Sequence, residues 1–195
     1  CCVEPNLING KERLISTQIL GAVAAHAIEH DIPLFVLAGK ETAFKEEIVS
    51  ALDGVACQWL IPNDVQKAED GVSIQVIDMN DLRSLQHVSQ VVVLKYRMAQ
   101  IFELVFAIRY LADLGVRKIK LCLTDIATMS ENALPAYQKA LKKVSTSLVD
   151  LYGQGRVTEL DILTDRLLLS TMSNCGAGET HLTIGPDGNV YACPL

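Results

Sequence analysis

The stretch that decides the fold is residues 90–124, QVVVLKYRMAQIFELVFAIRYLADLGVRKIKLCLT. Its two ends, QVVVLK (90–95) and KIKLCLT (118–124), are short runs rich in β-branched and apolar residues, which favour strands. The segment 98–115 between them is long enough for a helix. Its apolar residues recur at a spacing that makes one helical face, namely Ile101, Leu104, Val105, Ile108 and Leu111. Strand, helix and strand in this order predict a parallel pair with a covering helix.

The same alternation extends over most of the chain. It predicts an α/β fold, a partial or degraded barrel of mainly parallel strands with covering helices, ending in a small antiparallel hairpin. Further strands are expected at 33–38, 56–61, 73–78 and 158–164, and further helices at 14–30, 42–53 and 131–153.

Composition excludes several classes of function. The net charge of −6 argues against a nucleic-acid partner, because phosphate binding needs a basic face. No uncharged apolar run reaches 18 residues, so we expect no membrane partner. Half of the residues are hydrophobic, enough for a core without disulfides. The six cysteines therefore indicate a reducing, cytoplasmic compartment in which thiols are buried or bind metal.

The tail CGAGETHLTIGPDGNVYACPL (175–195) differs from the rest. Two alternating stretches flank Gly-Pro-Asp-Gly, in which proline presets one φ, aspartate bonds back to the backbone and glycine takes positive φ. This predicts an antiparallel hairpin between Cys175 and Cys193, spaced C-x12-G-x4-C, whose glycines expose N–H groups to a ligand. Two thiolates suit an iron–sulfur cluster or zinc, whereas the simpler alternative is two cysteines that merely flank a hairpin.

These residues resemble a known family. The C-x12-G-x4-C spacing with PDG-x-V-Y-x-C-P is similar to the opening half of a SPASM domain, the cluster-binding extension of many radical SAM peptide-modifying enzymes. The segment LTDRLLLSTMSNCGAG (163–178) resembles the CXXX repeat peptide maturases in particular. KERLI (11–15) and IPLFVLAG (32–39) resemble that family more weakly.

The resemblance implies a role in maturing a ribosomally made peptide with cysteine repeats, the expected partner. It implies a radical SAM-like α/β body over 1–170 and a SPASM-like hairpin that begins at 171–195. Within the body, polar residues gather at 79–90, where we expect a soft boundary. Cys175 and Cys193 would then bind an auxiliary [4Fe–4S] cluster.

The chain also departs from the family. It contains no C-x3-C-x2-C triplet to hold the cluster that cleaves S-adenosylmethionine, so use of that cofactor and enzymatic activity stay open. The tail ends before the further cysteines of a SPASM domain, and we expect the chain to be a fragment. Two alternatives are therefore kept, a non-catalytic module that recruits the precursor peptide and a structural zinc site.

Three other features invite a functional interpretation. HAIEH (26–30) matches the inverted zincin pattern H-x-x-E-H. The simpler explanation is that these are ordinary helix residues and that His30, in the last turn, offsets the negative end of the helix dipole. Asp165 and Arg166 follow the predicted strand 158–164, where Arg166 would contact a substrate carboxylate; the alternative is an ion pair that caps a helix. Cys57 and Cys122 lie in apolar strands and are expected to be core thiols.

Overall fold

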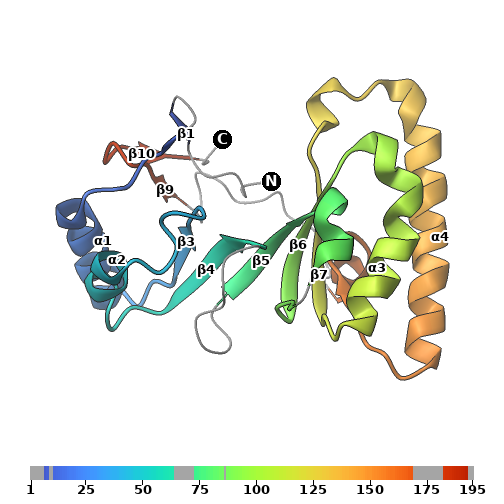
Figure 1. The fold of residues 1–195 in the computed structure, drawn as a ribbon, viewed down its shortest axis with the longest axis horizontal. Coiled ribbons are helices and arrows are strands. Elements are labelled where there is room, and N and C mark those ends of the chain that lie inside the picture. The colour runs from blue at the N-terminus through green and yellow to red at the C-terminus, as the bar shows by residue number, and fades with distance from the viewer. Residues whose placement is uncertain (1–6, 9–10, 64–72, 86, 169–181, 193–195) are drawn as a thin grey trace. The chain divides into compact units, whose positions relative to one another are not determined.

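The computed structural model describes residues 7–8, 11–63, 73–85, 87–168 and 182–192. The chain forms two compact units (Figure 1). The first, here called the sheet unit, contains Ile74–Met172 together with Cys1. The second, here called the hairpin unit, contains Cys2–Ser73 and Ser173–Leu195. Each unit is described by itself.

The sheet unit is built on parallel strands that follow one another in chain order. They are β5 (Ser73–Asp78), β6 (Val91–Tyr96), β7 (Lys118–Leu123) and β8 (Glu159–Leu160), each paired with the next. A sequential parallel order is that of a barrel wall, whereas a doubly wound sheet reverses its strand order. The strand–helix–strand unit expected at 90–124 is therefore confirmed.

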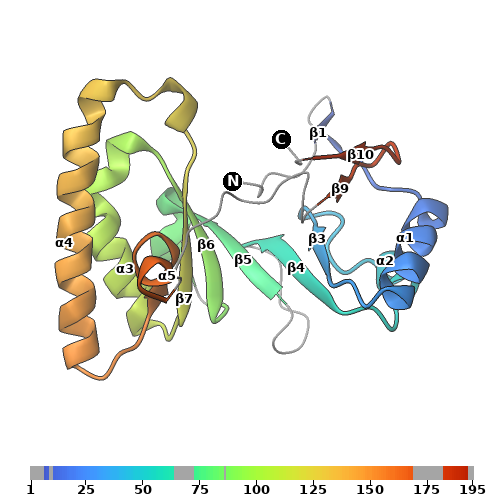
Figure 2. The same cartoon turned by 180° about the vertical axis from the view of Figure 1, so that it is seen from behind.

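Helical segments make the connections in the sheet unit. The 3₁₀ helices η1 (Met79–Ser84), η2 (Met98–Glu103), η3 (Ile126–Thr128) and η4 (Glu131–Ala133) accompany the α-helices α3 (Leu104–Asp113) and α4 (Leu134–Gly153). Helices α3 and α4 pack against each other (Figures 1 and 2). Because connections between adjacent parallel strands share one hand, successive helices come to lie on the same face of the sheet.

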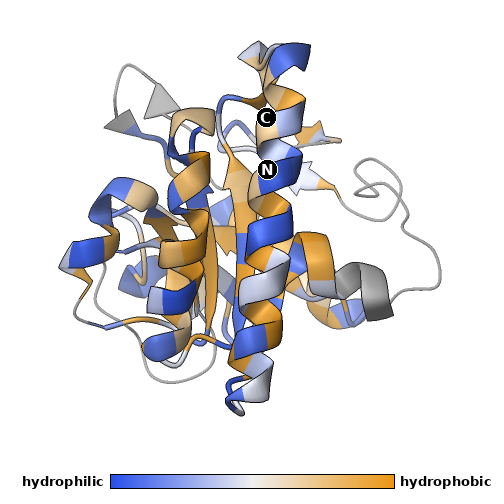
Figure 3. Cartoon of the chain, turned by 90° about the vertical axis from the view of Figure 1, so that its right-hand side faces the viewer, coloured by the Kyte–Doolittle hydropathy of each residue, from blue (hydrophilic) through white to orange (hydrophobic). Residues whose placement is uncertain are grey.

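The face of the sheet that α3 and α4 cover holds the larger of the two hydrophobic cores. Helix α4 is amphipathic, as its alternating hydrophobic and hydrophilic bands in Figure 3 show. Its buried residues recur every three or four positions and meet α3 and the strands. The residues of this core that are fully excluded from solvent include Ile77, Leu94, Leu104, Ile108, Leu111, Val144 and Leu160.

The hairpin unit is smaller. It contains β1 (Leu7–Ile8) paired antiparallel with β2 (Lys11–Glu12), α1 (Thr17–Glu29), β3 (Leu34–Leu37), α2 (Glu46–Ala51) and β4 (Cys57–Pro62). Strands β3 and β4 are parallel, and Leu20, Ala24, Ile48, Trp59 and Ile61 form the core under the two helices. The terminal strands β9 (Thr183–Ile184) and β10 (Val190–Tyr191) pair antiparallel.

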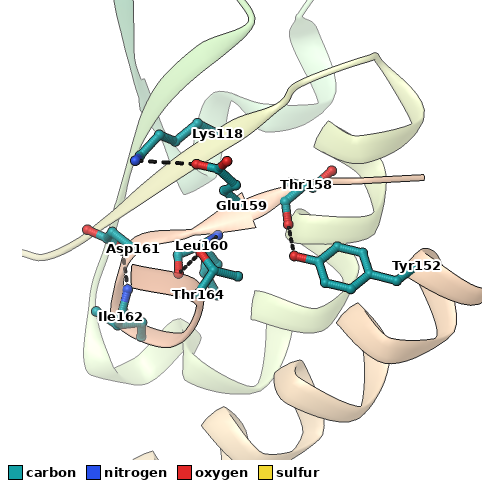
Figure 4. A network of polar contacts seen from close by, with 8 residues as sticks. All are labelled: Lys118, Tyr152, Thr158, Glu159, Leu160, Asp161, Ile162 and Thr164. Carbon is teal, nitrogen blue, oxygen red and sulfur yellow. Dashed lines mark hydrogen bonds and ion pairs between the residues drawn. The ribbon is translucent and has the colours of Figure 1, made fainter. Parts of the chain in front are cut away.

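The α/β class, the mainly parallel strands with helices and the terminal antiparallel hairpin are confirmed. The strand predicted at 158–164 is wrong beyond Leu160, because helix α5 (Asp161–Leu168) begins there. Figure 4 shows the polar contacts responsible. The Asp161 carboxylate accepts the Ile162 N–H at 2.8 Å, and the Thr164 hydroxyl donates to the Leu160 carbonyl at 2.9 Å. Short polar side chains that bond to nearby backbone favour a helix start over a strand.

Among the residues that the structure describes, no helix combines the length and the apolar character needed to cross a bilayer.

Candidate functional site

The predicted ligands Cys175 and Cys193 lie outside the described residues. The structure does describe residues 182–192, which hold the hairpin expected between them. Val190 pairs with Ile184 and Tyr191 with Thr183, which leaves Gly185–Asn189 as the connecting loop. The antiparallel arrangement is the one that returns the chain toward its starting point, as the predicted ligand pair requires.

The Gly-Pro-Asp-Gly turn is built as its chemistry predicts. The Gly188 N–H donates to the Gly185 carbonyl at 2.9 Å, and Gly188 has φ of 81°. Asp187 accepts the Asn189 N–H at 3.1 Å, which is the expected bond back to the backbone. The expectation that glycine N–H groups are exposed to a ligand is wrong for Gly188, because its N–H is used within the hairpin, as is that of Gly185, which donates to Asn189. Gly176 and Gly178 lie outside the described residues.

Asp187 organises the far side of the turn. Besides the Asn189 backbone, its carboxylate accepts the Tyr191 hydroxyl at 2.6 Å and the Asn189 side-chain amide at 2.9 Å. The Tyr191 hydrogen bond and then the Asn189 backbone N–H favour the charged carboxylate and lower the pKa of Asp187. The same bond raises the pKa of Tyr191, because the phenolate could no longer donate to Asp187. The turn is therefore fixed by a charged acceptor with three donors.

The turn also contacts helix α1. A Cβ at Gly188 would lie 2.7 Å from Ile19 Cδ1, closer than carbon atoms approach without one of them moving. Glycine is thus favoured at this position by its φ, and any larger residue would also have to displace the end of the Ile19 side chain. The hairpin is held on the first turns of α1.

The two N-terminal segments that resemble the maturase family more weakly meet in the hairpin unit. Glu12, from KERLI, places its carboxylate where a side chain of Gly39, from IPLFVLAG, would otherwise be. Gly39 directly follows Ala38 at the carboxyl end of β3, and its N–H donates to the Thr42 hydroxyl at 2.9 Å. One Glu12 carboxylate oxygen is buried without a hydrogen-bond partner. This contact fixes β2 against the end of a parallel strand.

Asp165 and Arg166 fall in helix α5, not after a strand as predicted. Their side chains lie outside the described residues, so their contact with a substrate stays a prediction. The local reason for their position is Asp161. Strand β8 stops at Leu160, and the Asp161 carboxylate accepts the Leu121 N–H at 3.2 Å, where a longer strand would offer a backbone carbonyl.

A row of polar side chains at the carboxyl end of the sheet was not predicted as a site. Asp78 is in register with Lys95, and Lys95 with Cys122, so the three side chains share the face opposite Ile77 and Leu94. All three are partly exposed. An acid, an ammonium and a thiol thus stand side by side where α/β proteins bind ligands. The period-2 alternation within each predicted strand shows which residues share a face, but the register that places these three side by side could not be predicted from the sequence.

The thiols expected in the core are only partly buried. Cys57 packs against the core of the hairpin unit, and this burial raises the pKa of its thiol. Cys122 has intermediate exposure on the polar face just described. Asp125, two residues beyond the end of β7, accepts the Met98 N–H at 3.0 Å and 3.1 Å with its two oxygens. That carboxylate therefore anchors the start of η2.

One group of potential metal ligands is present among the described residues. His26, Glu29 and His30 each offer a ligand atom, and these atoms all lie within 4.8 Å of one another at the exposed end of α1. Sequence reasoning had noted this H-x-x-E-H pattern but favoured ordinary helix residues. In comparisons with known proteins, no family model and no curated protein matches this chain.

Proposed function

We propose that this protein takes part in the maturation of a ribosomally made peptide with cysteine repeats, with Cys175 and Cys193 as ligands of an auxiliary [4Fe–4S] cluster. The observation that carries the proposal is the hairpin between the two cysteines. Its Gly185–Gly188 turn has the aspartate cap and the positive φ at Gly188 that a C-x12-G-x4-C cluster hairpin needs.

Two further features support the proposal. Sequential parallel strands with helices on one face are what a partial barrel of radical SAM type requires. Three hydrogen bonds to the Asp187 carboxylate and one from the Gly188 N–H stiffen the hairpin that separates the two cysteines in the sequence. Thiolates are the ordinary ligands of such clusters. The bound cluster would supply electron transfer or stabilise the fold around the peptide, and a cytoplasmic location would keep its ligands reduced.

Anaerobic reconstitution with iron and sulfide tests this function. We expect about four irons and four sulfides per chain, in a protein long enough to include any ligands after residue 195. Cys175→Ser and Cys193→Ser should each lower the iron content severely. Cys57→Ser and Cys122→Ser are matched controls, since these thiols belong to strands β4 and β7. Iron that persists in the double Cys175→Ser, Cys193→Ser variant would contradict the proposal.

Two additional measurements separate the remaining alternatives. A structural zinc clip at the same cysteines would give a colourless, redox-silent protein with zinc in place of iron. Cleavage of S-adenosylmethionine to 5′-deoxyadenosine under reducing conditions would identify a catalytic radical SAM enzyme. The 195 residues contain no C-x3-C-x2-C triplet, so we assign them no catalytic residue for that step.

A second candidate function is that of a non-catalytic module that binds the precursor peptide. The row Asp78, Lys95 and Cys122 favours it, because it places an ammonium at the edge of the sheet where α/β proteins bind ligands, and an ammonium can contact a peptide carboxylate. Asp78 itself accepts the Asn80 N–H at 2.9 Å. We expect Lys95→Ala to weaken the binding of a fluorescent cysteine-repeat peptide about tenfold. Lys139→Ala, an exposed lysine on α4, should leave it unchanged. Equal binding by both variants would exclude the row as the peptide site.

A further inference from the structure

We infer that the carboxyl-terminal turn of α1 is a binding site for a divalent transition-metal ion, with His26, Glu29 and His30 as ligands and Zn²⁺ as the best-suited ion. The site is independent of the cysteine pair. Ile19, on which the hairpin turn rests, is seven residues before His26, which is about 10 Å along the helix axis.

The helix brings the three side chains together. Residues at i, i+3 and i+4 lie on one side of an α-helix, and the rings of His26 and His30 have centroids 4.3 Å apart. Glu29 Oε2 lies 3.9 Å from His30 Nε2. The ligand atoms of all three residues lie within 4.8 Å of one another. No distant segment has to move to complete the group.

The backbone under these side chains is fixed. The His30 N–H donates to the His26 carbonyl at 3.1 Å, and the Ile32 N–H reaches back to the Ala27 carbonyl at 2.8 Å. The Asp31 N–H donates to Ile28, and Asp31 itself has φ of 52°. These bonds form a Schellman motif, which closes the last turn of the helix. His26 and His30 are therefore presented from a preorganised turn.

The choice of residues matches the chemistry of zinc. Two imidazole nitrogens and one carboxylate oxygen are the ligands of an open, three-residue zinc site, in which water takes the fourth position. Zinc–ligand distances of about 2.1 Å put tetrahedral ligand atoms about 3.4 Å apart, so the side chains have to close by roughly 1 Å. They can do so freely, because the side chains of His30 and Glu29 are 51% and 74% exposed. The buried residues of α1, Leu20, Ala24 and Ala27, are not disturbed.

Electrostatics also favour a cation at this end. The carboxyl terminus of a helix carries partial negative charge, to which Glu29 and the adjacent Asp31 add. Asp31 is notable because aspartate replaces glycine at a positive φ, and such backbone positions cluster at functional sites. An ordinary ion pair between Glu29 and His30 would use one histidine, whereas this geometry brings both into reach of the same point.

The test is a titration of the 195-residue chain with Zn²⁺, followed by NMR of the histidine ring protons. The chain has four histidines, so each ring can be assigned from its own His→Ala variant. We expect the His26 and His30 signals to shift together and to saturate near one equivalent. His87 is exposed in the sheet unit, and its signal should not move. Shifts of His26 and His30 no larger than that of His87 would overturn the inference.

Affinity gives a second readout, in which a loss on a His→Ala substitution assigns the zinc to the histidines and not to thiols. Calorimetry in a Cys175→Ser, Cys193→Ser background removes the proposed cluster ligands. There His26→Ala and His30→Ala should each weaken zinc binding at least about tenfold, since losing even an outer-shell partner costs that much. Glu29→Gln should weaken it several-fold, and His87→Ala should have no effect. Unchanged affinity in His26→Ala would refute the site. Iron loading of the intact tail is expected to be the same in His26→Ala, so this inference and the proposed function can fail separately.

Discussion

Three helices, α1 in the hairpin unit and α3 and α4 in the sheet unit, end with the same motif but not with the same residue. In the sheet unit, α3 and α4 each end in a Schellman motif centred on a glycine, Gly115 for α3 and Gly155 for α4. The Val116 N–H donates to the Leu111 carbonyl at the end of α3, and the Arg156 N–H donates to the Leu151 carbonyl at the end of α4. These glycines have φ of 86° and 76°. In the hairpin unit, α1 closes with the equivalent bonds around Asp31.

The difference indicates how each unit is stabilised. Glycine takes positive φ without strain, so the ends of α3 and α4 add no local cost to a unit that already has the larger apolar core. In the hairpin unit Asp31 and Phe44 both take positive φ, and Asp31 directly follows the candidate ligand His30. We therefore expect the largest losses of global stability from substitutions in the core of the sheet unit, and smaller changes from substitutions at the turns of the hairpin unit.

The largest effect is expected from the core of the sheet unit. Leu104, on α3, is completely buried. Leu104→Ala should lower the free energy of unfolding by about 2–5 kcal/mol, because it leaves a cavity as well as removing apolar contacts. Urea denaturation followed by circular dichroism measures the change. Val149→Ala on α4 is the control, since Val149 is 67% exposed and should change stability little. Similar losses for both variants would show that α3 is not the centre of the core.

A smaller effect is expected at the hairpin turn. Gly188→Ala should cost roughly 1–3 kcal/mol, from the positive φ and from the contact of the new Cβ with Ile19. Gly115→Ala isolates the first contribution, because Gly115 has a similar φ but no atom within 4 Å of its added Cβ. We expect Gly188→Ala to be the more damaging of the two by chemical denaturation of the same protein. A smaller loss for Gly188→Ala would mean that Ile19 moves aside at no cost.

Much of the fold could be predicted from the sequence because its signals are local. The helical face of 98–115 and the apolar strands that flank it encode the βαβ unit within 35 residues. The Gly-Pro-Asp-Gly turn likewise has its chemistry in four adjacent residues. Both were predicted correctly.

The features that were not predicted depend on contacts and geometry that only the folded chain shows. Residues 158–164 have an alternating pattern, but the Asp161 carboxylate bonds to Leu121 and Ile162 and ends strand β8 after Leu160. The row Asp78, Lys95 and Cys122 depends on strand register, which no local pattern specifies. The pattern HAIEH is visible in the sequence. The sequence does not show that the last turn of α1 brings the ligand atoms of His26, Glu29 and His30 within 4.8 Å of one another.

A modest gain is expected at the end of α1. Asp31→Gly should stabilise the protein by up to about 1 kcal/mol, because it relieves the positive φ in the motif that Gly115 and Gly155 already occupy without strain. Thermal unfolding should report a higher midpoint. Asp31→Asn removes the charge while keeping a side chain that tolerates this φ, and it should leave the midpoint almost unchanged. If Asp31→Gly lowers the midpoint, the aspartate side chain stabilises the folded protein by more than the positive φ of its backbone costs.

The smallest effect concerns pH at the hairpin turn. The pKa of Asp187 is lowered by the Tyr191 hydrogen bond, so the stabilisation is complete above the pKa of an unfolded aspartate, about 4, and is lost as pH falls through the lower folded value. The pKa of Tyr191 is raised by the same bond, so that contribution is complete below about pH 10 and is lost as pH rises through the higher folded value. NMR titration of the Asp187 carboxyl should therefore give a pKa below the ordinary aspartate value of about 4. In Tyr191→Phe the Asp187 pKa should move upward but stay below the ordinary value, because the Asn189 backbone N–H still donates to the carboxylate. An Asp187 pKa that is identical in both proteins would show that the phenol does not bind the carboxylate in solution, and the turn would then depend on Gly188 and the backbone alone.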